Sequence, residues 1–271
     1  MTHKRNIVFI SHGGGPMPLL GDPNHKEMVD TLKTIKNKID KTSGKPSAIL
    51  VISAHWEARQ PSITSASAPS LIYDYNGFPE ETYQIQYPSS GQPELAKCIH
   101  ESLAQAGINA TLDNQRGYDH GMFVPLTIMY PEAEIPCVQL SLVDSLDASV
   151  HLSIGQALKN LEWDNLLVIG SGFSFHNMRA FFDSNADVAN VKNHAFEQWL
   201  TSTMSDKALS EEQRTQLLAQ WEKAPFARFC HPREEHLLPL HVCYGMAGRA
   251  SDEIFEATII NKQSSMYLWQ A

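Results

Sequence analysis

The stretch IVFISH (residues 7–12) is an apolar run that leads into a histidine, and two others repeat the pattern: AILVISAH (48–55) and LLVIGSGFSFH (166–176). A short β-rich run closed by Gly or Ser is typical of a buried strand in a parallel sheet. Open α/β sheets bind ligands beyond the carboxyl ends of their strands. Imidazole is a common ligand of transition metals and titrates near neutral pH. The pattern therefore predicts a metal site at the carboxyl ends of these strands.

Length and composition indicate one domain spanning residues 1–271. The chain is 42% hydrophobic, and single hydrophobic cores stop growing at about 250–300 residues. Its net charge of -9, with scattered basic residues, argues against a nucleic-acid-binding protein. No apolar run reaches the roughly 18 residues of a membrane span. We therefore expect no membrane or nucleic-acid partner.

The cysteines and the N-terminus indicate a cytoplasmic protein. The first apolar run is too short for the apolar region of a signal peptide. None of the four cysteines pair as C-x-x-C, and we expect small buried thiols in a reducing compartment. The four are Cys98, Cys137, Cys230 and Cys243.

Periodicity predicts alternating strands and helices. The expected strands are residues 7–10, 48–52, 109–112, 135–142, 166–169 and 257–260. The expected helices begin near Pro23 and Pro93 and further cover residues 122–129, 147–161, 187–204 and 210–221. This alternation predicts a single α/β domain whose mainly parallel or mixed central sheet is flanked by helices.

Residues 58–91 are a long irregular segment with aromatic residues between turn formers at residues 73–79. Long loops in compact domains are usually functional. The segment is either a lid or wall over a pocket, or an ordinary surface loop with short antiparallel strands at 61–65 and 83–87.

Three local motifs suggest other chemistries, and each is incomplete. HGGG at residues 12–15 is typical of an esterase oxyanion hole, but the chain has no G-x-S-x-G nucleophile elbow. GSG at residues 170–172 lacks the third glycine of a dinucleotide fingerprint, and the zinc-protease motif H-E-x-x-H is absent.

Dispersed histidines remain as the candidate chemistry. His12 and His55 follow successive strands at equivalent offsets. Because consecutive strands are usually neighbours, both imidazoles could reach one ion. His231 and His241 are intermediate cases. The other histidines lack this context and are more typical of surface or helix positions: His3, His25, His100, His151 and His194.

The chain resembles the class III extradiol ring-cleaving dioxygenases, the family of protocatechuate 4,5-dioxygenase, over nearly its whole length. Within that family it is most similar to the branch of the 4,5-DOPA extradiol dioxygenases. The resemblance rests on the order and spacing of seven segments: SHG (11–13), SAHW (53–56), DYNGFP (74–79), YDHG (118–121), PCVQLS (136–141), GSG with HN (170–172, 176–177) and EHLLPL (235–240).

The resemblance implies a non-haem, metal-dependent dioxygenase that uses O2 to open a catechol ring in extradiol fashion. His12 and His55 are the implied metal ligands, with His236 as the third and Glu235 as its alternative. His176 is either a fourth ligand or the acid–base group, and His120 hydrogen-bonds substrate or oxygen. Iron(II) is the metal expected for activity, and zinc could occupy the same site.

Three aromatic residues, Tyr75, Phe78 and Phe175, are the candidates for a wall around the substrate ring. The expected partners are a small catechol and O2, with a homo-oligomer left open. Two alternatives remain. One is a zinc-dependent hydrolase or another zinc-bound enzyme, and the other is a non-catalytic peptide-binding relative of the same fold.

Overall fold

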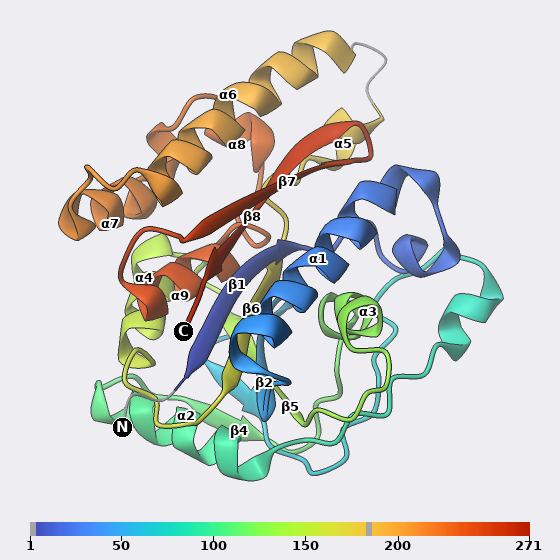
Figure 1. The fold of residues 1–271 in the computed structure, drawn as a ribbon, viewed down its shortest axis with the longest axis vertical. Helices are drawn as coiled ribbons and strands as arrows, with labels where there is room; N and C mark the ends of the chain where they lie inside the picture. The colour runs from blue at the N-terminus through green and yellow to red at the C-terminus, as the bar shows by residue number, and fades with distance from the viewer. Residues whose placement is uncertain (1–3, 183–185) are drawn as a thin grey trace.

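The computed structural model describes residues 4–182 and 186–271, which places His3 outside the described residues. A mixed sheet passes through the molecule in the strand order β4-β3-β5-β2-β6-β1-β8-β7 (Figure 1). Its strands are β1 Arg5–Ser11, β2 Ala48–Ala58, β3 Ser62–Thr64, β4 Thr111–Asp113, β5 Cys137–Val143, β6 Leu166–Gly172, β7 Glu253–Ile259 and β8 Lys262–Trp269.

The centre of the sheet is parallel. The neighbouring strands β5, β2, β6 and β1 all run in one direction, and every residue of β5 and β6 is buried. Strands β8 and β7 add an antiparallel edge, and β3 runs antiparallel to β5. Burial on both faces explains why these strands appear in the sequence as continuous apolar runs. The predicted α/β class is confirmed.

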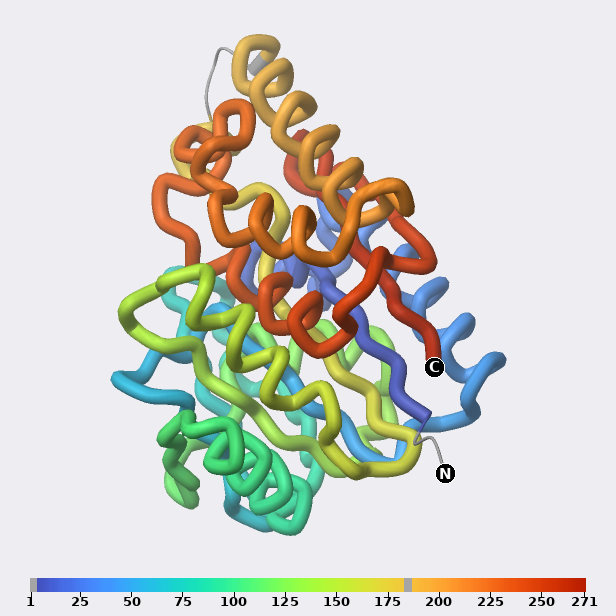
Figure 2. The backbone as a smooth tube through the Cα atoms, turned by 90° about the vertical axis from the view of Figure 1, so that its left-hand side faces the viewer, coloured from blue at the N-terminus to red at the C-terminus, as the bar shows by residue number. Residues whose placement is uncertain are grey.

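Helices cover both faces of the parallel core. α1 and α3 pack on one face, whereas α4 and α9 pack on each other and α9 contacts β6, β1 and β2 (Figure 1). α6 packs on β8, and Figure 2 shows α6 and α7 at the end of the molecule opposite α2. The helices are α1 Lys26–Ser43, α2 Pro93–Gln105, α3 His120–Met129, α4 Ala148–Ala157, α5 Met178–Phe181, α6 Ala186–Ser205, α7 Glu211–Ala219, α8 Ala227–Cys230 and α9 Leu238–Ala247. In the described part of the chain, no helix is long and apolar enough to cross a bilayer.

The strand order corrects one expectation. β1 and β2 are not neighbours, because β6 lies between them. The strand that intervenes ends in two small residues, Ser171 and Gly172. Side chains from β1 and β2 can therefore meet above the end of β6.

Two other segments differ from the sequence prediction. The expected strand at residues 257–260 belongs to a hairpin formed by β7 and β8, so the C-terminal segment is also a strand. In the long loop, the strand expected at 61–65 is β3, whereas residues 80–84 form a 3-10 helix where the second strand was expected to begin.

β2 continues beyond its apolar run and bulges. Ile52 pairs with Leu140 and Glu57 pairs with Leu142, so five residue steps on β2 lie opposite two on β5. His55 lies in this bulge, inside the strand rather than in a loop after it. Bulges near active sites commonly redirect a side chain, and this one directs His55 towards the end of β1.

Glycines in β6 allow another segment to cross the sheet at very short range. A Cβ atom at Gly172 would lie 2.1 Å from the carbonyl oxygen of His236, and one at Gly170 would lie 2.8 Å from that of Pro239. The crossing is held by a hydrogen bond of 2.9 Å from Phe173 N to His236 O. The GSG segment therefore provides close backbone approach and brings His236 to the sheet.

We expect Gly172→Ala to destabilise the protein by about 1–3 kcal/mol, as overpacking of a tight contact usually does. It should also weaken zinc binding, because the displaced backbone carries His236. Urea unfolding and competition with a chelator measure the two effects. Gly155→Ala is the matched control, since its Cβ would lie 2.2 Å from Val242 O, at the contact of α4 with α9. A Gly172→Ala protein that binds zinc as tightly as Gly155→Ala contradicts this account.

Candidate metal centre and active site

Six histidines line one cavity of about 290 Å³, and five of them converge from separate segments. They reach it from the end of β1, the bulge of β2, the first turn of α3, the loop after β6 and the segment before α9. They are His12, His55, His120, His176 and His236. All histidines for which the sequence predicted a metal or catalytic role are thus brought together.

Three of the rings are evenly spaced around one centre. The ring centroids of His12 and His55 are 4.8 Å apart, and that of His236 lies 5.2 Å from the first and 4.9 Å from the second. The other two rings each lie against a member of this triangle. His120 is 3.8 Å from His55, and His176 stacks on His236 at 3.5 Å.

Hydrogen bonds define the tautomer of His12. The hydroxyl of Ser171 donates to the carbonyl oxygen of Gly121, so its oxygen can only accept from His12 Nδ1, 2.9 Å away. The proton of the neutral imidazole is therefore on Nδ1. This leaves the lone pair on Nε2, which lies 3.0 Å from Nε2 of His55.

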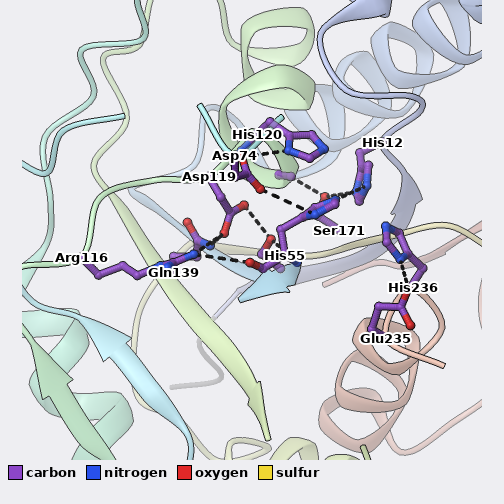
Figure 3. A network of polar contacts seen from close by, with 12 residues as sticks. His12, His55, Asp74, Arg116, Asp119, His120, Gln139, Ser171, Glu235 and His236 are labelled. Carbon is purple, nitrogen blue, oxygen red and sulfur yellow. Dashed lines mark hydrogen bonds and ion pairs between the residues drawn. The ribbon is translucent and has the colours of Figure 1, made fainter. Parts of the chain in front are cut away.

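Asp74, which lies in the long loop, supports the imidazoles of two histidines (Figure 3). Its Oδ1 accepts hydrogen bonds from the backbone N and Nδ1 of His120, both at 2.9 Å. Its Oδ2 lies 3.6 Å from Nδ1 of His55. Burial alone would raise the pKa of Asp74, but the hydrogen bonds and positive partial charge of His120 bring it below its usual value.

Glu235 supports the other pair in the same way. Its Oε1 lies 3.0 Å from Nδ1 of His236 and 3.2 Å from Nδ1 of His176. Burial opposes ionisation of this carboxyl group, yet the two imidazole hydrogen bonds hold its pKa well below the ordinary range. Glu235 is thus an anionic acceptor behind the histidines.

Burial keeps the three evenly spaced histidines neutral. Desolvation, followed by the proximity of the neighbouring imidazoles, lowers the pKa of His12 and His55 well below 6.5. The same causes, with His176 as the main neighbour, lower the pKa of His236 to about 3. A neutral imidazole with a free lone pair is the form that binds a metal.

The donor set fits a transition-metal ion. Nδ1 of each histidine faces a hydroxyl or carboxylate acceptor, and such partners are the usual second layer of metal-binding histidines. Two groups have ligand atoms within 4.8 Å of one another: His12 with His55 and His120, and His176 with Glu235 and His236. Several neutral nitrogen donors around one point suit iron or zinc.

A buried polar network fixes the bulge that carries His55 (Figure 3). Asp119 is completely buried and accepts hydrogen bonds from Ser53 Oγ, at 2.7 Å, and from Gln139. Arg116 lies 3.4 Å from the same carboxylate and stacks its guanidinium 4.8 Å from the ring centre of Trp56. The network links β2 and β5 to the start of α3.

The aromatic wall is only partly as predicted. Tyr75 and Phe78 line the cavity, so the long loop forms one of its walls. Phe175 does not line it, because its ring is completely buried against Phe181 and Phe229. Phe173, two residues earlier, lines the cavity instead. Regular extended backbone would put these two side chains on the same side, but the chain bends at Ser174, after the end of β6, and they point to different sides.

His25 was expected at a surface or helix position, but it lies in the wall of the cavity. His25 is 2% exposed and lines the cavity. Its Nε2 accepts a hydrogen bond from Gly14 N at 2.9 Å, and its Nδ1 lies 2.5 Å from Asp22. A Cβ atom at Gly13 would lie only 2.7 Å from Cδ2 of His25. The absence of a side chain at Gly13 therefore lets the HGGG loop pack closely on the His25 ring.

Comparisons with known proteins agree with this geometry. A family model described as the catalytic LigB subunit of aromatic ring-opening dioxygenase matches residues 6–267. The 4,5-DOPA dioxygenase extradiol of Beta vulgaris is 41% identical over 248 residues, which cover 91% of this chain and 88% of that protein. Dioxygenase tasH of Hapsidospora irregularis is 39% identical over 253 residues, covering 89% and 78%.

A solved structure shares the fold across its whole length. An uncharacterized protein from Escherichia coli K12 superposes with a TM-score of 0.73 at 25% identity, covering 97% of this chain and 98% of that one. The resemblance seen in the sequence is confirmed, and the chain belongs to the family of the catalytic LigB subunit of aromatic ring-opening dioxygenases.

Proposed function

We propose that this protein opens the ring of a catechol beside its diol, using O2, at a single metal ion in the histidine cavity. The observation that carries the proposal is the convergence of neutral imidazoles, with their Nε2 atoms free, in a cavity walled by aromatic rings. Relatives named 4,5-DOPA dioxygenase extradiol at 41% and 39% identity support extradiol cleavage.

We assign His12, His55 and His236 as the metal ligands. Their even spacing lets three Nε2 atoms approach one ion from different directions. Glu235 is a less suitable third ligand, because its Oε1 is already the acceptor for two imidazoles. His120 is the competing third ligand, since its nitrogen is also within reach of His12 and His55.

The proposed metal is iron(II). Three protein ligands leave positions open for exchangeable ligands, as in other non-haem iron oxygenases. Held by His12, His55 and His236, iron(II) would supply coordination positions for catechol and O2 and would lower the pKa of the catechol hydroxyl groups.

His176 is the proposed acid–base group. Its Nδ1 faces Glu235, so its Nε2 is the atom that can take a proton from a catechol hydroxyl. The resulting imidazolium is stabilised by the Glu235 carboxylate, which remains ionised. Stacking on His236 at 3.5 Å keeps His176 beside the proposed ligands.

His120 is the proposed hydrogen-bonding partner of substrate or oxygen. Asp74 orients it through both the backbone N and Nδ1, which directs Nε2 away from the carboxylate. Its ring also lies 5.6 Å from that of Tyr75, on the aromatic wall. His120 therefore lies between the histidine centre and the surface that would contact a substrate ring.

Iron-loaded protein should consume one O2 per catechol and form a yellow semialdehyde whose new carboxylate carries ¹⁸O from ¹⁸O2. Zinc-loaded protein should consume none, because zinc has no redox chemistry. An oxygen electrode and mass spectrometry test this with protein reconstituted anaerobically. Absence of catechol-dependent uptake by the iron form, together with ester hydrolysis by the zinc form, would favour the zinc-hydrolase alternative.

Alanine substitutions separate the histidines that bind metal from those that move protons. His236→Ala should lower metal affinity at least tenfold, as loss of a ligand does, and abolish turnover. His176→Ala and His120→Ala should retain the metal, with turnover reduced by about 10²–10⁴-fold for the acid–base residue. Metal content and oxygen uptake are measured on the same samples. Metal loss in His120→Ala but not in His236→Ala would reverse the ligand assignment.

A further inference from the structure

Among the residues that the structure describes, no carboxylate, ammonium or guanidinium group lines the catalytic cavity. The rest of its lining is glycine backbone with aromatic and aliphatic side chains. Tyr75 contributes a hydroxyl group, but that hydroxyl donates to the carbonyl oxygen of Thr82 at 2.6 Å. Both nitrogens of His25 are also engaged, with Gly14 and Asp22. A polar substituent on the substrate ring would therefore meet few partners.

The two carboxylates behind the imidazoles would not help an anion, and the two arginines nearby do not line the catalytic cavity. Asp74 and Glu235 lie directly behind the imidazoles, where they accept hydrogen bonds from Nδ1 of His120 and of His236. Arg233 forms two 2.6 Å contacts with Glu57 and lines a second pocket, which shares His176 and Met178 with the catalytic cavity. Arg179 also lines that second pocket and not the catalytic cavity.

The cavity extends to solvent over an apolar rim. Phe182 and Met178 line it, although their side chains are 77% and 57% exposed. Exposed large apolar side chains around a cavity commonly mark a binding surface. Phe181 and Ile260 continue the apolar lining nearby, so a substituent that projects from a bound ring would contact hydrocarbon.

We propose that the substrate of this enzyme is a catechol with an uncharged, apolar ring substituent, such as a short alkyl or aryl group. This inference rests on the proposed catechol cleavage. It distinguishes the chain from relatives named for DOPA, whose side chain carries a carboxylate and an ammonium group. A charged group held against this hydrocarbon loses part of its hydration without gaining a partner, which is unfavourable.

Binding and turnover of size-matched catechols test the proposal. The probes are 4-propylcatechol, which is neutral, 3-(3,4-dihydroxyphenyl)propionate, which is anionic, and L-DOPA, which is zwitterionic. We expect kcat/KM of the iron enzyme and affinity of the zinc-loaded protein, measured by calorimetry, to favour the neutral probe by about tenfold or more. Equal or weaker binding of 4-propylcatechol relative to the charged probes overturns the proposal.

A pair of lysine substitutions locates the origin of the preference. Phe182→Lys places a cation at the apolar rim and should shift the affinity ratio towards the anionic probe by at least about threefold. Val191→Lys is the matched control, because Val191 is 66% exposed on α6 but does not line the cavity. It should leave both affinities unchanged. An equal shift in both variants would show that the rim does not determine the preference.

The two proposals fail in different ways. Unsubstituted catechol reports on ring cleavage alone, so its lack of turnover by the iron enzyme contradicts the proposed function. The calorimetric comparison on zinc-loaded protein needs no turnover and decides the substituent preference by itself.

Discussion

The structure depends on one constraint: each of the five converging histidines has its Nδ1 facing an acceptor. Ser171 serves His12, Asp74 serves His120 and lies near His55, and Glu235 serves the remaining pair. A neutral imidazole protonated on Nδ1 has its lone pair on Nε2. The acceptors thus direct several lone pairs to one point, which is costly without a metal and favourable with one.

The fold meets this constraint by bringing distant segments very close to β6. Gly172 allows the His236 backbone to cross the strand, and Ser171 forms the acceptor for His12 on the neighbouring strand. The bulge of β2, fixed by Asp119, supplies His55 from the other side. Small residues at the end of one central strand therefore permit both the packing and the chemistry.

Local patterns predicted much of the fold and the identity of the histidines. Apolar runs and helical spacing act over short distances, so the central strands and most helices were expected near their observed positions. The insertion of β6 between β1 and β2 was not, because strand order depends on contacts between remote segments. His25 and Phe182 were missed for the same reason, since their sequence neighbours do not show that they face the cavity. The extent of the domain over residues 1–271 stays a prediction.

The most direct test is two-bond ¹H–¹⁵N NMR of the zinc-loaded protein labelled at histidine, at pH 7. We predict that His12, His55 and His236 bind zinc through Nε2 and carry their proton on Nδ1. His120 should show the same Nδ1–H tautomer, hydrogen-bonded to Asp74. Zinc bound through Nδ1 in the three ligands, or a proton on their Nε2, would contradict it.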